Sequence, residues 1–161
     1  MTKIVINITA RELMQRNVIC VAPNETLFDA LELMTENHVT GIPVLDTNDR
    51  CIGLVSSTDI LDIEHDGTDA AEYGRFYDPD TGRWQDVPLT TFHKARLSEI
   101  RVSEVMSGTL ISVAPNATLT DVCAMMSENE VHRLLVVDKQ LGLHGLISSI
   151  DVVRWIADQN T

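Results

Sequence analysis

The apolar residues of the chain form two similar series of short runs, one in each half of the sequence. Each series begins with a run rich in β-branched residues, at 18–21 (VICV) and 110–113 (LISV), which predicts a short strand that ends before a proline. Apolar residues then recur at helical spacing, which predicts an amphipathic helix. These helix positions are Leu27, Ala30, Leu31 and Met34 in the first series and Leu119, Val122, Cys123 and Met126 in the second.

The polar residues predict where these helices begin and where further strands end. Thr26 is followed three residues later by Asp29, and Thr118 by Asp121, a pattern typical of a helix start with a capping box. Two more apolar runs follow in each series, and the short polar turn at 47–50 predicts that they pair as a hairpin. A second helix begins at the paired serines of GLVSSTD and GLISSID. Each series therefore predicts a β-α-β-β-α unit, and the fold class is α/β in the broad sense (α+β).

The two series are copies of one domain. A shift of 92 positions aligns residues 12–59 with 104–151 without a gap, and 21 of these 48 positions are identical. A period this long exceeds that of solenoid repeats, so it predicts a duplicated domain with pseudo-twofold symmetry. We expect domain 1 at 8–65, an insertion and linker at 66–97, and domain 2 at 98–158.

The insertion has no counterpart in the repeat. It is acidic, yet it holds five of the seven aromatic residues of the chain, which favours packing of part of it over complete disorder. Its segment DPDTG (78–82) predicts a surface turn. The segment lacks the downstream spacing and the glutamate of a calcium loop.

Composition and charge limit the partners. The net charge of −12 disfavours a nucleic acid. No apolar run is long enough for a signal peptide or a membrane span, so we expect a cytoplasmic protein without a membrane partner. Cys20, Cys51 and Cys123 have no metal-type spacing and lie in apolar stretches, so we expect buried thiols in a reducing compartment. No metal site is expected.

The doubled junction GLVSSTD and GLISSID admits two interpretations. Ser56 with Asp59, and Ser148 with Asp151, fit a serine cap with an acid three residues later, while Gly53 and Gly145 allow close strand approach. Alternatively, the helix start binds phosphate through its amides and the serine, and the aspartate accepts hydrogen bonds from a ribose.

His132 and Arg133 favour the binding interpretation. They stand at the entry of an apolar strand, where two adjacent hydrogen-bond donors are costly unless solvent or an anion meets them. Alternatively, Arg133 extends to water and His132 is an ordinary surface histidine. With the junctions, the pair indicates a nucleotide pocket.

These motifs resemble the cystathionine beta-synthase (CBS) domain, which normally occurs as a tandem pair. VAPNETL with VAPNATL, GIPVLD, GLVSSTD and GLISSID carry the resemblance, over about 100 residues in two copies in register. The family implies two units packed by their sheets, with two clefts between the copies that bind AMP, ADP, ATP or S-adenosyl nucleosides. By this resemblance Asp59 and Asp151 hold ribose, Ser56 and Ser148 face phosphate, and His132 with Arg133 contacts phosphate. The implied apolar walls around the adenine are Val18, Ile19, Leu110, Ile111, Ile42, Pro43 and Leu134.

Two departures from the family pattern distinguish the copies. The first copy has Thr40 and Gly41 where the second has His132 and Arg133, so the two clefts should bind phosphate unequally. The second copy has Leu135 in place of the proline found at Pro43.

The expected function is a regulatory, ligand-sensing module that binds an adenine nucleotide, without a further cofactor, and acts through an effector protein. The alternatives are a structural pairing module without a ligand and a sensor of S-adenosylmethionine. An enzyme is not expected, because the sequence offers no nucleophile–base pair, metal ligand set or Walker loop. We also expect a homodimer, because Phe28, Leu33 and Met125 add apolar surface to the repeated helices.

Overall fold

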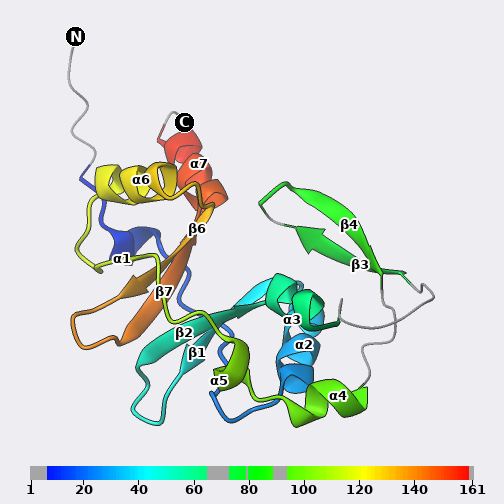
Figure 1. The fold of residues 1–161 in the computed structure, drawn as a ribbon. Coiled ribbons are helices and arrows are strands. Elements are labelled where there is room, and N and C mark those ends of the chain that lie inside the picture. Colours follow the sequence, from blue (N-terminus) through cyan, green and yellow to red (C-terminus); the bar gives the residue numbers. More distant parts are fainter. Residues whose placement is uncertain (1–6, 65–72, 79, 89–93, 160–161) are drawn as a thin grey trace. The chain divides into compact units, whose positions relative to one another are not determined.

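The computed structural model describes residues 7–64, 73–78, 80–88 and 94–159, in an α+β arrangement of helices and small sheets (Figure 1). The first repeat contains α2 (Leu27–Glu36), β1 (Gly41–Leu45), β2 (Cys51–Ser56) and α3 (Ser57–Glu64). The second contains β5 (Ser112–Val113), α6 (Leu119–Glu128), β6 (Arg133–Val137), β7 (Leu143–Ser148) and α7 (Ser149–Asp158). The remaining elements are α1 (Ala10–Leu13), β3 (Tyr73–Asp78), β4 (Arg83–Pro88), α4 (Lys94–Glu99) and α5 (Val102–Val105).

The second repeat has the predicted β-α-β-β-α order. β5 pairs in parallel with β6, and β6 pairs antiparallel with β7, with Arg133 opposite Ser148. In the first repeat, β1 and β2 form the predicted hairpin, but the strand expected at 18–21 is reduced to Val21. Val21 donates its N–H to the Pro43 carbonyl at 3.0 Å and accepts from the Leu45 N–H at 2.9 Å.

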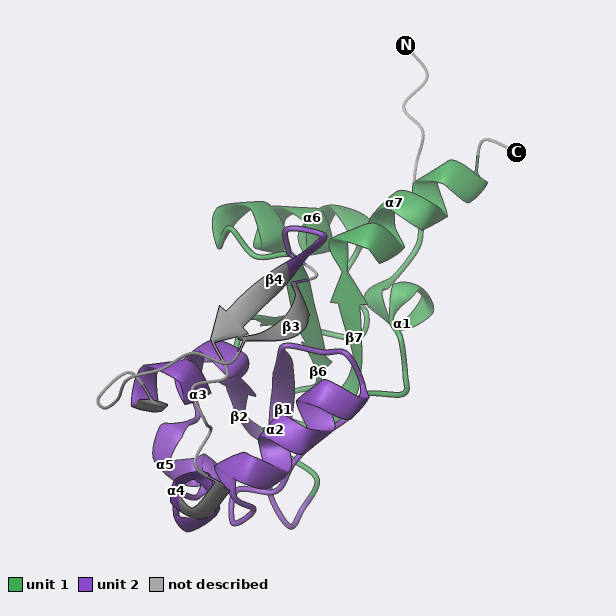
Figure 2. Ribbon diagram, turned by 90° about the vertical axis from the view of Figure 1, so that its right-hand side faces the viewer, with its two compact units in different colours: residues 1–18, 49–51, 110–161 green, residues 19–48, 52–109 purple. Residues whose placement is uncertain are grey.

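The expected first strands are short because the chain changes unit there. The described chain divides into two compact units, shown in two colours in Figure 2: unit 1 is residues 1–18, 49–51 and 110–161, and unit 2 is residues 19–48 and 52–109. Apart from residues 49–51, which belong to unit 1, the chain therefore passes from one unit to the other between residues 18 and 19 and again between 109 and 110. A segment that connects two units leaves few residues to extend a strand in either.

The segments that precede the repeats, residues 9–15 and 101–107, exchange places, and we call them the leaders. The first leader pairs with the second repeat, through the bridge between Gln15 and Leu146. The second leader pairs with the first repeat, through the equivalent bridge between Leu54 and Ser107. Each compact unit thus contains most of one repeat and the leader of the other, an exchange that the sequence analysis did not predict. The domain boundaries 8–65, 66–97 and 98–158 follow the repeat along the sequence and stay a prediction.

Each unit has its own apolar core, built from matched positions of the two repeats. In unit 2 the shared set is Val21, Leu27, Ala30, Met34, Ile42, Val44, Val55 and Ile60. In unit 1 it is Val113, Leu119, Val122, Met126, Leu134, Val136, Ile147 and Val152. Among the described residues, no helix combines the length and apolar character needed to cross a membrane.

The insertion forms a β-hairpin. β3 and β4 pair antiparallel, from Tyr73 opposite Pro88 to Asp78 opposite Arg83. The predicted turn joins them: the Asp78 carboxylate accepts hydrogen bonds from the Asp80 N–H at 2.9 Å and the Thr81 hydroxyl at 2.8 Å. The turn prediction is confirmed, while the two strands were not predicted.

Candidate functional site

Each doubled junction turns a strand directly into a helix, and a serine caps that helix. In unit 2, the Asp59 Oδ2 accepts from the Ser56 N–H and hydroxyl, both at 2.8 Å, and the Asp59 N–H donates to the Ser56 Oγ at 3.2 Å. In unit 1, Ser148 and Asp151 make the same three bonds at 2.8, 2.8 and 3.2 Å. The capping interpretation of the junction is confirmed.

The glycine of each junction stands against a leader. A Cβ at Gly53 would lie 2.9 Å from the Ser107 carbonyl oxygen, and one at Gly145 would lie 2.5 Å from the Gln15 carbonyl oxygen. These separations are shorter than real Cβ contacts. The glycines therefore allow the close strand approach that the sequence suggested.

The start of each second helix is largely satisfied from within the protein. A serine hydroxyl has a single proton, and those of Ser56 and Ser148 are donated to the aspartates. The first helical amide is also bonded, since Ser57 N–H donates to the Thr40 carbonyl at 2.9 Å and Ser149 N–H to the His132 carbonyl at 2.8 Å. Phosphate binding by Ser56 and Ser148 stays a prediction, and it requires these bonds to be exchanged.

The cap leaves one oxygen of the aspartate for another donor. Asp59 is half-buried, and within the part of the chain that the structure describes its carboxylate accepts hydrogen bonds from Ser56 alone, both at Oδ2. Its Oδ1 is therefore an oriented acceptor. In unit 1 the corresponding Oδ1 of Asp151 accepts a hydrogen bond from the Gln15 Nε2 at 3.0 Å.

His132 and Arg133 lie at the junction of unit 1. Arg133 begins β6 opposite Ser148, and His132 precedes it. His132 is exposed and lines a pocket, while Arg133 is half-buried and is absent from that lining.

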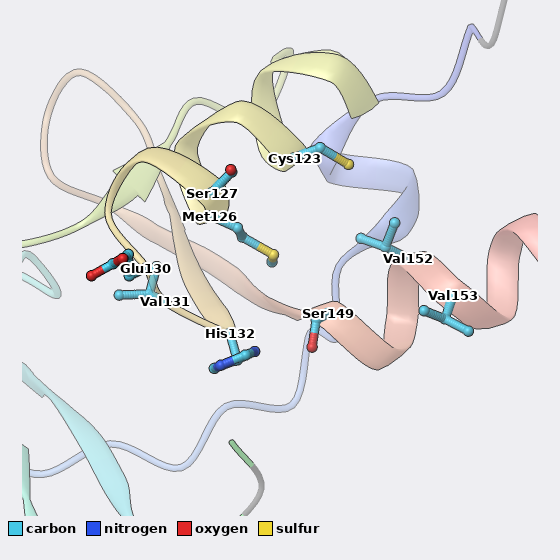
Figure 3. Close-up of a pocket in the computed structure, with 9 residues that line it drawn as sticks. All are labelled: Cys123, Met126, Ser127, Glu130, Val131, His132, Ser149, Val152 and Val153. Carbon is cyan, nitrogen blue, oxygen red and sulfur yellow. The ribbon is translucent and has the colours of Figure 1, made fainter. Parts of the chain in front are cut away.

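The pocket lies between α6 and the start of α7 and has a volume of about 490 Å³ (Figure 3). Its lining is mostly apolar, with polar groups from His132, Ser127, Glu130 and Ser149. Ser148 and Asp151 are not among its lining residues. The pocket therefore includes His132 but not the rest of the predicted nucleotide set.

The predicted apolar walls divide into two groups. Ile42, Pro43 and Leu134 are buried, Ile42 and Leu134 within the core of their own unit, so they present no surface to a ligand here. The four others retain accessible surface: Val18, Leu110 and Ile111 are half-buried, and Ile19 is exposed. These four residues are therefore the better candidates for an apolar wall.

The three cysteines differ in exposure. Cys51 is buried and Cys20 half-buried, but Cys123 is exposed on α6, so the expectation of buried thiols is wrong for Cys123. Its matched residue Leu31 is buried, whereas Cys123 lines the open pocket beside α7. Among the described residues, no group of three or more His, Cys, Asp or Glu could hold a metal ion.

Comparison with known proteins identifies both repeats. The family model for the CBS domain matches residues 10–66 and 102–158. Two curated relatives from Arabidopsis thaliana are similar: CBS domain-containing protein CBSX1, chloroplastic, with 31% identity over 135 residues, and CBSX2, chloroplastic, with 30% identity over 146 residues. These alignments cover 83% and 87% of the chain, and the chain spans 57% and 59% of the two relatives.

Solved structures show the same fold. The crystal structure of CBSX2 in complex with AMP has a TM-score of 0.69 and 25% identity, covering 95% of this chain and 98% of that one. The CBS domain pair of protein MJ0100 was solved with 5′-methylthioadenosine and S-adenosyl-L-methionine. Its TM-score is 0.64, and the match covers 94% of this chain and 98% of that one. At 14% identity the second likeness concerns the fold alone.

Proposed function

Because the chain belongs to the CBS domain family, we propose that it is a regulatory module that binds an adenine nucleotide and is not itself an enzyme. The observation that carries the proposal is the oriented, half-buried carboxylate of the junction. The cap fixes Asp59 through Oδ2 and leaves Oδ1 for a ribose hydroxyl. AMP is the first ligand to test, since the similar protein CBSX2 has been crystallised with it.

The proposed roles divide the ligand into three parts. Asp59 and Asp151 are the candidate acceptors for the sugar. Arg133 and His132 are the candidate donors to phosphate, as charged side chains make the stronger hydrogen bonds to it. The adenine contacts the accessible apolar residues Val18, Ile19, Leu110 and Ile111.

Binding acts as a signal only if two arrangements of the protein differ in affinity for the ligand. The chain would then report nucleotide occupancy to an effector protein. A structural pairing module without a ligand is the second candidate, because the helix starts are already satisfied by the cap.

A thermal-shift experiment with AMP, ADP, ATP and S-adenosylmethionine tests the proposal. A ligand at a hundred times its dissociation constant adds about 2.7 kcal/mol to the stability of the folded state. For a chain of this size, that raises Tm by about 5–10 °C. Absence of a shift with all four would favour the pairing module, and a shift with S-adenosylmethionine alone would favour that sensor.

Arg133→Ala tests the phosphate role. Loss of a charge-assisted donor weakens the binding free energy by about 1.5–3 kcal/mol. The affinity for AMP should therefore fall about ten- to a hundredfold, while the affinity for adenosine stays unchanged. Calorimetry with both ligands measures this difference. Arg154→Ala, at an exposed position of α7, is the matched control. Equal losses for AMP and adenosine would show that Arg133 does not read phosphate.

We also propose a homodimer, though through a surface other than the one the sequence favoured. Phe28, Leu33 and Met125 are only half-buried, packed against their own cores. Three of the four large apolar side chains exposed in the described part of unit 1 lie instead on α7, at Ile150, Val153 and Ile156; the fourth, Leu141, is in the turn between β6 and β7. Val153 also lines the pocket between α6 and α7.

A further inference from the structure

The two matched aspartates differ in one contact. The Gln15 Nε2 lies 3.0 Å from Oδ1 and 3.2 Å from Oδ2 of Asp151, so its amide meets both carboxylate oxygens. Within the described part of the chain, Asp59 accepts hydrogen bonds from Ser56 alone. One sugar acceptor is therefore filled by the protein, and the other is open.

The exchange of leaders explains this difference. Gln15 pairs with Leu146, and its matched residue Ser107 pairs with Leu54, so each faces the junction of the repeat with which it packs. The glycine at each junction lets the leader backbone approach closely. At the same backbone position, glutamine is long enough to reach the carboxylate of Asp151, whereas serine leaves Asp59 without such a partner.

A ribose diol would need the acceptor that Gln15 occupies. Oδ1 has two acceptor positions and the Gln15 amide takes one of them, so a ribose diol with its two hydroxyl donors must displace a hydrogen bond to a charged group at Asp151. That displacement lowers affinity by about ten- to a hundredfold.

We propose that Gln15 is a specificity-determining residue that occupies the sugar acceptor Asp151, so that the chain takes its adenine nucleotide first through Asp59. The inference rests on the proposed function and deepens it, because it states which of the two repeated junctions holds the sugar. The asymmetry arises in the leaders, outside the duplicated junction motif itself.

Exchanging the two leader residues tests the inference. Gln15→Ser gives Asp151 the same neighbour that Asp59 has, and calorimetry with AMP should show a second binding event or one strengthened about ten- to a hundredfold. The double variant Gln15→Ser, Asp151→Asn should lose that gain. Ser107→Gln places the longer amide opposite Asp59, and it should weaken the original binding by a similar factor. Gln140→Ser, in an exposed turn of unit 1, is the control for the loss of a glutamine.

The outcomes separate the inference from the proposed function. If wild type binds AMP at two equal sites, or if Gln15→Ser weakens binding, Gln15 does not close the Asp151 site, while the proposed function survives. If wild type does not bind but Gln15→Ser binds through Asp151, Gln15 does close the Asp151 site, but binding through Asp59 and the proposed wild-type function are both wrong. If neither binds AMP or adenosine, both are wrong. A double-mutant cycle of Tm without ligand, using Gln15→Ser and Asp151→Asn, tests whether the two side chains interact in the folded protein. Residues in contact give changes in Tm that are not additive.

Discussion

At the scale of single residues, the capping requirement of the doubled junction and its proposed binding site involve the same side chain. Asp59 caps α3 with one carboxylate oxygen and keeps the other for a further donor. From the sequence alone, capping and ligand binding are competing interpretations, because the sequence does not reveal which carboxylate oxygen a cap uses. The serine is different, since its only proton is donated to the cap.

The junction glycines give a prediction about stability. Gly145→Ala should destabilise the protein by about 1–3 kcal/mol, because the new methyl group would overlap the backbone of Gln15, which cannot rotate away as a flexible side chain would. Thermal unfolding followed by circular dichroism should show a Tm lower by at least about 2 °C. Gly108→Ala is the control, because apart from its chain neighbours no atom lies within 4 Å of the place that its new methyl group would take. Equal Tm values for the two variants would contradict the close approach.

At the scale of elements, the sequence predicted what local chemistry determines. The caps at Thr26 and Thr118, both hairpins within the repeats and the turn at 78–82 are all present. The exchanged leaders and the β3–β4 hairpin were missed because they depend on pairing rather than on periodicity. A leader of one short helical turn carries no amphipathic pattern, and the acidic and aromatic composition of the insertion does not alternate as a strand should.

The same limit applies to the candidate site. Motif and spacing located Asp59 and Asp151, but the contact that distinguishes them comes from Gln15, 136 positions away from Asp151. The buried positions of Ile42 and Leu134 also follow from packing within each unit. Only the structure could show which of the apolar candidates keep accessible surface.

The helix caps give a prediction that depends on pH. Thr26 donates hydrogen bonds from its hydroxyl, at 2.7 Å, and its backbone N–H, at 2.9 Å, to Asp29, and these lower the pKa of that carboxyl. Thr26→Ala should cost about 1 kcal/mol, a fall in Tm of about 2–4 °C. Because the pKa of Asp29 is lowered in the folded state, the ionised cap stabilises above the unfolded pKa of about 3.9 and is lost as the pH falls through the lower folded value.

The Tm difference between wild type and Thr26→Ala should therefore be full at neutral pH and shrink below about pH 4. Thr118→Ala should behave alike, since Thr118 lowers the pKa of Asp121 through its backbone N–H and its hydroxyl. Thr120→Ala, at an exposed position of α6 beyond the cap, is the control. A difference that persists unchanged at pH 3 would mean that the carboxylate does not contribute to the cap.

At the scale of the whole molecule, duplication has produced two units with the same core but different surfaces. The two cores share eight matched positions, whereas Leu31 in the core of unit 2 is matched by the exposed Cys123, and further differences lie beside the junctions and on the second helices. The first copy has Thr40 and Gly41 where the second has His132 and Arg133. Gln15 of the first leader corresponds to Ser107 of the second. Packing keeps the shared core positions alike, while the residues beside the junctions have diverged.

The second helices give the prediction for assembly. α7 exposes Ile150, Val153 and Ile156, where the matched positions of the first repeat are Thr58, Leu61 and Glu64. Val153 is 57% exposed and lies beside the apolar pocket, so a second molecule that covers this surface removes apolar area from water. Size-exclusion chromatography with light scattering should give twice the chain mass of 17.9 kDa for wild type at micromolar concentration.

Val153→Asp places a charge in that surface and should shift the protein toward the mass of one chain, because an unpaired charge is costly to bury. Its secondary structure should stay native, since the side chain contributes little to the core of unit 1. Gln140→Asp adds the same charge in an exposed turn and should leave the dimer intact. If Val153→Asp is still a dimer while wild type is one, the partner covers a different face, and the half-buried flank at Phe28, Leu33 and Met125 becomes the surface to mutate next. A monomeric wild type would contradict the proposed homodimer.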